Sequence, residues 1–359
     1  MDFENVLIFR IGHLGDTVVA LPALWAIREA FPNTRVTLLT NIDLKNPHYV
    51  SPRDVLPEKG IVDEWIAYPT NLGSAERAFA FLRLSLELRS RKFDTVIYLM
   101  PRIRTSRQID RDIGFFRFSG IQRVIGAEYL RQNSLTMQMP LPTSAIESES
   151  DFLLKLLASE GIPVDGPNLR TDMLLNDTEV SSAKKWIVKV AKTDNKGRKL
   201  IAVAPGSKWK SKIWEEQRYA DVVERLIAEN NCYPVIFGGD EDREIGERLL
   251  AGWKIGANAA GALTIRESAA LLKDCCLYLG NDTGTMHLAA AVGTPCVAIF
   301  AAIDWRGRWV PFGDGNLIFR KTVECEGCHT PDCFNQHKCL DLVNTNEVYE
   351  ACDQIVHAN

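Results

Sequence analysis

The chain has 359 residues, of which 46% are hydrophobic and 25% are charged, and its formal net charge at pH 7 is −4. This length provides for two packed cores rather than one. Acidic and basic residues are interspersed, which argues against a dedicated nucleic-acid binder. No apolar run in the sequence is long enough to span a bilayer, and the N-terminal residues follow a strand pattern rather than that of a signal peptide. We therefore expect a cytoplasmic protein, whose nine cysteines are thiols or metal ligands rather than disulfides.

The N-terminal residues predict a βαβ unit, with a buried strand at 6–11, a loop at 12–16, a helix at 17–31 and a second strand at 35–40. Glycines in the loop let the turn run close to a ligand. Their spacing is not the G-x-G-x-x-G pattern, so we expect neither a nicotinamide nor a flavin site. Asp16 follows the first strand and adjoins the start of the helix. A carboxylate there can cap the helix or act as a general base, and the local pattern alone favours the cap.

An arginine-rich segment follows an amphipathic helix predicted at 79–88 and an inner strand predicted at 93–99. Two interpretations are open. The charges can lie on a solvated helix face, or they can form a basic patch for a phosphorylated or carboxylated acceptor, since guanidinium groups bind such anions bidentately. The segment contains Arg102, Arg104, Arg107, Arg111, Arg117 and Arg123, opposed by Asp110 and Asp112. For the cluster we favour the basic patch, with Arg102, Arg104 and Arg107 as candidate acceptor-binding residues.

Prolines and glycines gather between 140 and 172, and we expect the domain boundary there, with a first domain at 1–172 and a second at 173–359. It stays open whether the last helix packs back on the first domain. The second half repeats the alternation of strand and helix, which predicts a second doubly wound sheet. Its strands are expected at 200–204, 234–237, 275–279 and 296–300, and its helices at 215–229, 241–250 and within 261–273. Two such sheets facing each other across a cleft would place a ligand in that cleft.

The turn between the last two predicted strands is the most informative stretch. Residues 280–282 end a strand, Thr283 and Gly284 begin a helix, and His287 lies one turn further on. Free backbone N–H groups and the positive end of the helix dipole would then face the carboxyl edge of the sheet, which suits a phosphate group. The alternative is an ordinary helix cap with a partly buried histidine, and the local pattern does not separate the two.

Two further features follow other strands of this half. A basic loop comes directly after Gly206 and Ser207, and it can either hold a diphosphate or be solvated. An acidic run at 240–244 follows the next strand, where a carboxylate can accept hydrogen bonds from ribose hydroxyls. The lysines of the basic loop are Lys208, Lys210 and Lys212. Together with the turn at Asp282, these features predict a nucleotide-diphosphate pocket.

At these motifs the chain resembles glycosyltransferase family 9, the bacterial heptosyltransferases of lipopolysaccharide core assembly. The resemblance extends over 6–348 and rests on RIGHLGDTVVALPAL at 10–24, Pro205-Gly206, KIW at 212–214, Gly238-Gly239, NDTGTMH at 281–287 and GTP at 293–295. It implies an α/β protein of the GT-B arrangement, with two Rossmann-like, doubly wound domains facing across a cleft and the donor held mainly by the C-terminal one. It also implies inverting transfer of heptose from ADP-heptose to an inner-core lipopolysaccharide acceptor, without a catalytic metal.

Position by position, the resemblance makes Asp16 the general base that deprotonates the acceptor hydroxyl, and Lys212 the catalytic lysine that neutralises the departing diphosphate. This reverses the local preference for a cap at Asp16. An aspartate can accept a proton at neutral pH, and a lysine with helix N–H groups can stabilise charge on departing ADP. The implied donor-binding residues are Gly15, Gly206, Ser207, Asp242, Asp282, Thr283, Gly284 and His287. His13 stands where many members carry a small hydroxyl residue, so we expect the contacts of that loop to differ.

Four cysteines lie in one short C-terminal stretch, at Cys325, Cys328, Cys333 and Cys339. Thiols this close in sequence suit a tetrahedral zinc or iron site, and a subgroup of the family that acts on proteins uses an iron-binding finger. Alternatively, reduced thiols brace a long loop, since the spacings do not repeat the paired C-x2-C of a zinc ribbon. We treat the cluster as a candidate structural zinc or iron site and expect no cofactor in the chemistry.

The expected partners are a nucleotide-sugar donor, with ADP-heptose favoured, and a glycolipid or glycan acceptor, without nucleic acid. A cytoplasmic enzyme with such an acceptor is expected to contact the inner membrane peripherally. One alternative keeps the transferase chemistry with another nucleotide sugar, or with a protein or another glycan as acceptor. A second is a sugar-nucleotide epimerase of the same architecture, which would need further acid/base carboxylates. A third is a binding protein without turnover, against which the presence of Asp16 and Lys212 speaks.

Overall fold

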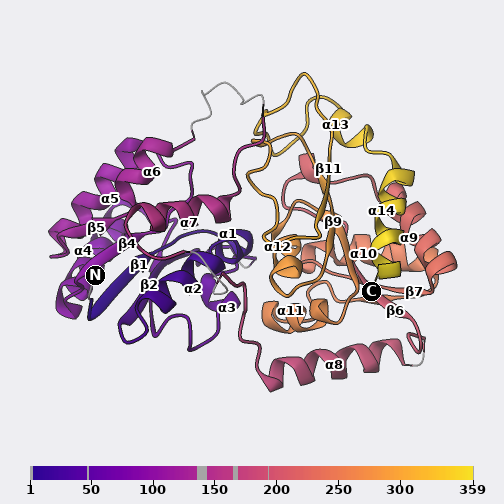
Figure 1. Ribbon diagram of the computed structural model, residues 1–359, viewed down its shortest axis with the longest axis horizontal. Coiled ribbons are helices and arrows are strands. Elements are labelled where there is room, and N and C mark those ends of the chain that lie inside the picture. The colour runs from indigo at the N-terminus through magenta and orange to yellow at the C-terminus, as the bar shows by residue number, and fades with distance from the viewer. Residues whose placement is uncertain (1–2, 47, 136–143, 165–168, 193, 359) are drawn as a thin grey trace. The chain divides into compact units, whose positions relative to one another are not determined.

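The computed structural model describes residues 3–46, 48–135, 144–164, 169–192 and 194–358. The chain divides into two compact units, of which the first is Met1–Pro140 with Glu149–Leu174, and the second is Leu141–Ser148 with Leu175–Asn359. Each unit has its own parallel sheet with helices packed on it (Figure 1). Both doubly wound sheets that the strand and helix pattern predicts are therefore present.

The first unit contains a five-stranded sheet in the order β3-β2-β1-β4-β5, in which every neighbouring pair is parallel. Its strands are β1 (Asn5–Phe9), β2 (Arg35–Ile42), β3 (Glu64–Pro69), β4 (Thr95–Tyr98) and β5 (Arg123–Ile125). Val6, Leu7 and Ile8 in the central strand are fully or almost fully buried, as expected for a strand covered on both faces. The strand order reverses between β1 and β4, so the loops after these strands meet at a topological switch point, where open α/β sheets bind ligands.

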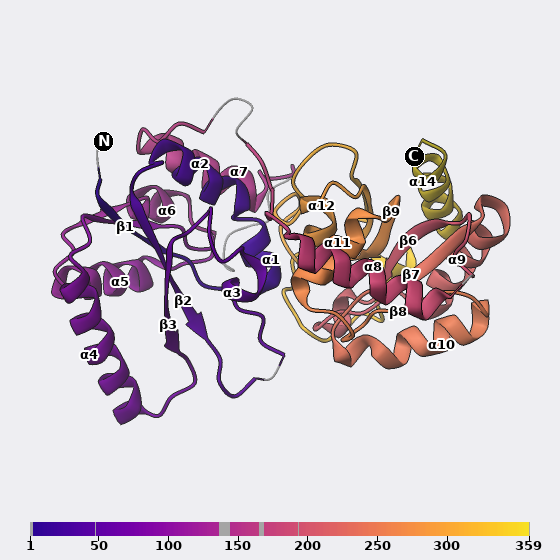
Figure 2. The ribbon, with the colours of Figure 1, turned by 90° about the horizontal axis from the view of Figure 1, so that it is seen from below.

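The helices of the first unit are α1 (Leu14–Val18), α2 (Leu21–Ala30), α3 (Pro52–Val55), α4 (Ser74–Arg91), α5 (Ser106–Phe118), α6 (Ala127–Asn133) and α7 (Glu149–Ser159). Helices α2 and α7 pack together, α4 and α5 pack together, and the two pairs lie on opposite sides of the sheet (Figure 2). The single helix predicted at 17–31 is wrong, because α1 ends at Val18 before α2 begins. Pro22, in the first turn of α2, has no N–H to donate to the carbonyl one turn earlier, so it cannot continue the first helix.

Helix α4 is longer than the predicted segment 79–88 and buries little of its surface. It ends before Lys92, whose φ of 54° is left-handed. Its buried residues are Leu84, Ser85 and Leu88. Within the described residues no helix, α4 included, is both long and apolar enough to cross a membrane.

The second unit contains a six-stranded sheet in the order β11-β10-β9-β6-β7-β8. Its strands are β6 (Lys199–Ala204), β7 (Cys232–Ile236), β8 (Ala257–Asn258), β9 (Leu277–Asn281), β10 (Cys296–Phe300) and β11 (Leu317–Arg320). β10 has the predicted bounds, whereas β9 runs past its predicted end to Asn281, which pairs in register with Ile299. Here the strand order reverses between β6 and β9, so this unit has its switch point at the loops that follow them.

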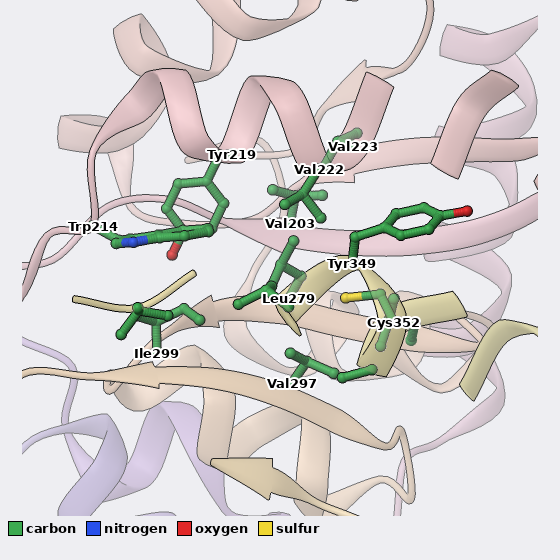
Figure 3. Close-up of a cluster of buried hydrophobic side chains, with 14 of the residues drawn as sticks. Val203, Trp214, Tyr219, Val222, Val223, Leu279, Val297, Ile299, Tyr349 and Cys352 are labelled. Atoms are coloured by element: carbon green, nitrogen blue, oxygen red, sulfur yellow. The ribbon is translucent and has the colours of Figure 1, made fainter. Parts of the chain in front are cut away.

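The helical elements of the second unit are α8 (Asp177–Ala191), η1 (Lys210–Lys212), α9 (Glu216–Asn230), η2 (Asp240–Asp242), α10 (Arg243–Trp253), α11 (Ile265–Lys273), α12 (Gly284–Ala291), α13 (Lys338–Asp341) and α14 (Thr345–Ala358). The last helix, α14, packs within this unit against α9. Its Tyr349 and Cys352 join Trp214 and Tyr219 in a core that also includes strands β6, β9 and β10 (Figure 3).

Candidate active site

The loops after β6 and β9 are joined by one buried amide, that of Asn281 at the end of β9. Its Nδ2 donates to the carbonyl oxygens of Pro205 at 2.7 Å and Gly206 at 3.2 Å. Its Oδ1 accepts from the backbone N–H of Trp214 at 3.1 Å and from the hydroxyl of Tyr219 at 2.9 Å. The side chain is fully buried, and these bonds satisfy both donors and both lone pairs of the amide. Asn281 therefore holds the two loops in one arrangement.

Lys212 and Asp282 form an ion pair across the same two loops. The Nζ of Lys212 donates to Oδ2 of Asp282 at 2.6 Å and to its carbonyl oxygen at 3.4 Å. The two side chains are only 18% and 7% exposed, so removal of one partner would leave the other charge poorly solvated. A lysine ammonium has three donors, which allows one further bond to an anion. The fold thus brings together the predicted catalytic lysine and the predicted aspartate of the phosphate turn.

Helix α12 begins two residues after Asp282, with Thr283 as its N-cap, as the sequence pattern predicts. The Oγ1 atoms of Thr283 and Thr285 are 2.8 Å apart, and the hydroxyl of Tyr278 lies 3.0 Å from the latter. N–H groups in the first turn of a helix lack acceptors inside the helix, so they present partial positive charge at the carboxyl edge of the sheet. His287 lies further along α12 and is buried, with its ring centre 6.2 Å from that of Trp309.

Asp242 lies against the glycines that follow β6 and β7. A Cβ atom added to Gly206 would lie 1.8 Å from its Oδ1, and one added to Gly238 would lie 2.3 Å from its Oδ2. Burial raises the pKa of Asp242 to about 6, although the N–H of Gly239, which donates to Oδ2 at 3.0 Å, acts in the opposite direction. Ser207 follows in the same loop, and its Oγ accepts a backbone N–H at 3.3 Å. These glycines therefore let the carboxylate lie at the edge where such folds bind a ribose.

Arg10 and Asp16 occupy the switch point of the first unit. Arg10 is buried, and it donates through Nη1 to the carbonyl of Leu99 at 3.1 Å and through Nε and Nη2 to the carbonyl of Asp16 at 3.1 and 2.5 Å. The Oδ2 of Asp16 accepts the backbone N–H of His13 at 3.0 Å, which caps α1. Its Oδ1 lies 3.9 Å from Nη2 of Arg10, and the side chain is 24% exposed. Gly15 is in the first turn of α1. The carboxylate therefore caps the helix and remains accessible.

The three arginines predicted for the acceptor do not contact the same elements. The guanidinium of Arg102 lies 4.7 Å from the ring centre of Phe152 in α7. Arg104 pairs instead with Asp112 of α5 at 3.2 Å, and Arg107 is exposed in the first turn of α5. Their closeness in sequence did not predict this, because neighbouring positions of a loop can direct their side chains to opposite sides of a sheet.

Arg104 and Arg111 line a cavity of about 190 Å³ between the first sheet and helices α4 and α5. Asp112 pairs with both arginines, at 3.2 and 2.8 Å, and accepts the hydroxyl of Tyr98 at 2.7 Å. The apolar walls are Phe9, Leu39, Tyr68, Phe81, Leu84, Phe115 and Phe116. The charge run indicated the arginines, but the aromatic walls come from four separate stretches of sequence, so no local pattern indicated the cavity.

The sulfurs of the four clustered cysteines accept hydrogen bonds from separate groups at 3.2–3.4 Å. Burial raises the pKa of the Cys339 thiol. Within the described ranges, no three His, Cys, Asp or Glu side chains are grouped so that they could hold a metal ion. The cysteines are Cys325, Cys328, Cys333 and Cys339, all free thiols. Their arrangement gives no support to the expected zinc or iron site.

Residues 81–338 match the model of glycosyltransferase family 9 (heptosyltransferase). The chain belongs to this family. It is 26% identical to lipooligosaccharide heptosyltransferase 2 of Haemophilus influenzae, over 82% of this chain and 83% of that protein. The solved structure of a family 9 glycosyltransferase from Veillonella parvula has a TM-score of 0.76 at 19% identity and covers 100% of this chain and 98% of that one. For ADP-heptose lipopolysaccharide heptosyltransferase II of E. coli the TM-score is 0.70 at 18% identity, with 99% of each chain covered.

This family 9 protein is a glycosyltransferase with two Rossmann-like units of the GT-B fold. The resemblance inferred from the motifs is confirmed. Membership of a transferase family speaks against the two alternatives of a sugar-nucleotide epimerase and of a binding protein without turnover. Two residues at the switch points were missed as organisers of the loops, Arg10 and Asn281. Both stand inside the motifs, but their partners lie as far as 89 and 76 positions away, so a local pattern could not indicate their role.

Proposed function

We propose that this enzyme transfers heptose from ADP-heptose to an inner-core lipopolysaccharide sugar, with inversion at the anomeric carbon. Two similar proteins carry names of this activity, a lipooligosaccharide heptosyltransferase and an ADP-heptose lipopolysaccharide heptosyltransferase. The observation that carries the donor part is the Lys212–Asp282 pair beside the N-terminus of α12, at the switch point of the second sheet. A cation and a helix N-terminus at this place suit a diphosphate.

Each part of the proposed donor has a complementary group in the second unit. The diphosphate oxygens accept from Nζ of Lys212, from first-turn N–H groups of α12 and from the hydroxyl of Thr283. The ribose hydroxyls donate to Asp242, while Gly206 lets the nucleotide approach the backbone. The remaining candidate donor contacts in this unit are Ser207, Asp282, Gly284 and His287.

In the proposed reaction, the acceptor oxygen forms a bond to the anomeric carbon while the bond from that carbon to the β-phosphate oxygen breaks. The acceptor proton passes to the carboxylate of Asp16, and the electron pair of the broken bond leaves with ADP. Lys212 and the helix N–H groups stabilise the charge that develops on ADP. The scheme balances without a metal ion or another cofactor, and we propose that none takes part.

The geometry at Asp16 is compatible with a base that also caps a helix. Oδ2 accepts the His13 N–H, which leaves Oδ1 for the acceptor proton. The nearby guanidinium of Arg10, whose Nη2 is 3.9 Å from Oδ1, keeps the carboxylate oriented. Because Arg10 is itself fixed by two carbonyl oxygens, the base does not depend on a flexible partner.

The arginines after β4 divide into different proposed roles. Arg107 is exposed and can pair with a carboxylate or phosphate of the acceptor. Arg104, beside the aromatic cavity, can orient the same acceptor, whereas the contacts of Arg102 suit a role in holding the loop. An acceptor carried by a lipid would bring the enzyme to the cytoplasmic face of the inner membrane as a peripheral protein.

A thermal-shift panel with ADP, UDP and GDP tests the donor part on the whole protein. ADP should raise the melting temperature by several degrees at saturating concentration, because a ligand that binds only the folded state stabilises it. Larger stabilisation by UDP or GDP would favour the alternative of another nucleotide sugar. No shift with any of the three would contradict the nucleotide site.

Incubation with ADP-heptose and a heptose-free inner-core acceptor then tests the reaction. The product should gain the mass of one heptose, and its anomeric signal in NMR should show inverted configuration. Transfer to a protein or to another glycan, with none to the inner-core acceptor, would favour the alternative acceptors. ADP binding without any transfer would contradict the proposed reaction while leaving the site intact.

A further inference from the structure

Helix α4 carries a row of large apolar side chains that face solvent. Phe79, Leu82 and Leu86 are 69%, 51% and 60% exposed. Their spacing of three and four residues places them on one side of the helix. Phe118, at the end of α5, is 63% exposed. We call these four residues the α4 stripe. Exposed apolar side chains gathered on one side of a helix mark an interaction site more often than scattered single residues do.

The two helices that form the α4 stripe are fixed to each other. Nη2 of Arg89 in α4 donates to the carbonyl oxygen of Phe118 at 2.8 Å. Beside it, the hydroxyl of Ser119 donates to that of Ser85 at 3.0 Å in a buried contact. In both ribbon views α4 lies at the periphery of the first unit (Figures 1 and 2). The stripe is therefore presented on a rigid pair of helices.

Acidic groups on α4 and α5 are engaged by neighbouring partners. Glu87 pairs with Arg91 at 2.8 Å, and Asp110 pairs with Arg131 at 2.7 Å. Asp112 is shared by two arginines that line the cavity, as described above. Glu76 accepts a backbone N–H at the start of α4 at 3.2 Å and keeps its negative charge. Together α4 and α5 contain seven arginines and four acidic residues, so the net charge of the two helices is positive.

Arginines beside the α4 stripe remain uncompensated. Arg83 and Arg117 are exposed, and neither forms an ion pair with any residue that the structure describes. Arg89 is also exposed, and its contact is with a carbonyl oxygen rather than a carboxylate. Apolar side chains on one side of a helix with flanking arginines are the features by which a helix lies in the interface of an anionic bilayer.

We propose that the α4 stripe docks this enzyme on an anionic lipid surface, with Arg83, Arg89 and Arg117 against the headgroups. The inference deepens the proposed membrane contact and rests on it. A second copy of the chain fits less well, because pairing two stripes would bring these arginines close to their own counterparts. The long side chains of arginine can also reach from the edge of an apolar surface to charged headgroups.

Co-sedimentation of the whole protein with vesicles tests the proposal without any transfer assay. Vesicles of phosphatidylethanolamine and phosphatidylglycerol should retain the protein, vesicles of phosphatidylcholine should not, and added salt should weaken retention. Arg83→Gln with Arg117→Gln should lower the partition by about fivefold for each arginine. Phe79→Ser with Leu82→Ser should lower it at least about tenfold, since two apolar side chains no longer insert.

Val188→Ser with Val190→Ser is the matched control, because it removes two exposed apolar side chains, 63% and 42% exposed, from α8. It should leave the partition unchanged, and all variants should melt within a few degrees of the wild type. The proposal would be overturned by equal retention on both vesicle types, or by retention that neither the arginine variant nor the apolar variant lowers.

Sedimentation velocity in the absence of lipid tests whether a second copy of the chain, rather than a lipid surface, binds the α4 stripe. If the wild type is a dimer and the Phe79→Ser with Leu82→Ser variant is a monomer, the stripe binds a second copy of the chain and the proposal is overturned. The thermal shift with ADP distinguishes a failure of the proposed donor site from a failure of the proposed lipid surface. Vesicle binding without an ADP response contradicts the proposed donor, whereas an ADP response without vesicle binding contradicts only the lipid surface.

Discussion

The two switch points of the molecule hold a carboxylate and a cation in different ways. In the first unit, Asp16 is 24% exposed, and Nη2 of Arg10 is 3.9 Å from its Oδ1. In the second, the Asp282 side chain is 7% exposed, and Nζ of Lys212 is 2.6 Å from its Oδ2. Both sheets reverse their strand order at these points. The two units therefore share this topology, and they differ in the exposure and the charge pairing of the carboxylate in the loops.

This difference separates two chemical tasks. A carboxylate that is accessible and only loosely paired can accept a proton. A cation held by a buried carboxylate, beside the N-terminus of a helix, instead offers a fixed positive site for an anion. Changes at Asp16, Lys212, Gly206 and Asp242 test this division.

Asp16→Asn should have the largest effect. The amide oxygen can still accept the His13 N–H and preserve the cap of α1, but it cannot take up the acceptor proton. The transfer rate should fall by about a hundredfold or more, while ADP affinity by calorimetry stays unchanged. Asp54→Asn is the control, since Asp54 caps α3 through an equivalent contact, with the Ser51 N–H at 2.8 Å. A transfer rate close to wild type in Asp16→Asn would remove the base assignment.

Lys212→Ala should weaken donor binding and turnover together, because the diphosphate loses its cation and Asp282 is left buried without it. We expect ADP affinity to fall about tenfold or more, and the free energy of unfolding to fall by about 2–4 kcal/mol. Titration with ADP and urea unfolding measure the two effects. Lys210→Ala removes an exposed lysine two positions earlier and should alter neither. An unchanged ADP affinity in Lys212→Ala would contradict its proposed contact.

Gly206→Ala should displace Asp242, since the added Cβ would lie 1.8 Å from its Oδ1. The carboxylate would have to leave the edge of the sheet, and ADP affinity should fall about tenfold, in line with typical costs of overpacking. Gly252→Ala in α10, where an added Cβ meets nothing within 4 Å, is the control and should leave ADP affinity unchanged. Equal affinities for the two variants would argue against a ribose contact at Asp242.

The smallest effect concerns pH. Burial raises the pKa of Asp242 from 3.8 to about 6, so between these values the folded protein holds a proton that the unfolded chain has released. The contribution of this group to stability is therefore full below pH 3.8 and is lost as pH rises to about 6. Asp242→Asn should remove this part of the pH dependence in thermal melts. ADP affinity of the wild type should rise through pH 6, because the ionised carboxylate is the better acceptor for ribose hydroxyls. The same profile in Asp242→Asn would exclude Asp242 as its source.

Prediction from the sequence worked where a signal is local. The alternation of apolar strands with amphipathic helices indicated both parallel sheets, and Cys296–Phe300 was placed at its observed bounds. The start of α12 after Thr283 was also predicted, because the residue preferences at the start of a helix act within one turn. The break between α1 and α2 was missed although Pro22 stands there, since the apolar pattern continues across it.

By itself, the sequence determined the fold class, the family and the positions of the charged loops relative to their strands, since all of these follow from periodicity and short motifs. Tertiary structure decided which side chains meet. The Asn281 amide, the Lys212–Asp282 pair, the separation of Arg102 from Arg104 and the exposed α4 stripe all depend on contacts or exposure set by strand order and helix packing. The physical reason is that a side chain's partners lie across the sheet, tens of residues away, where no pattern along the chain records them.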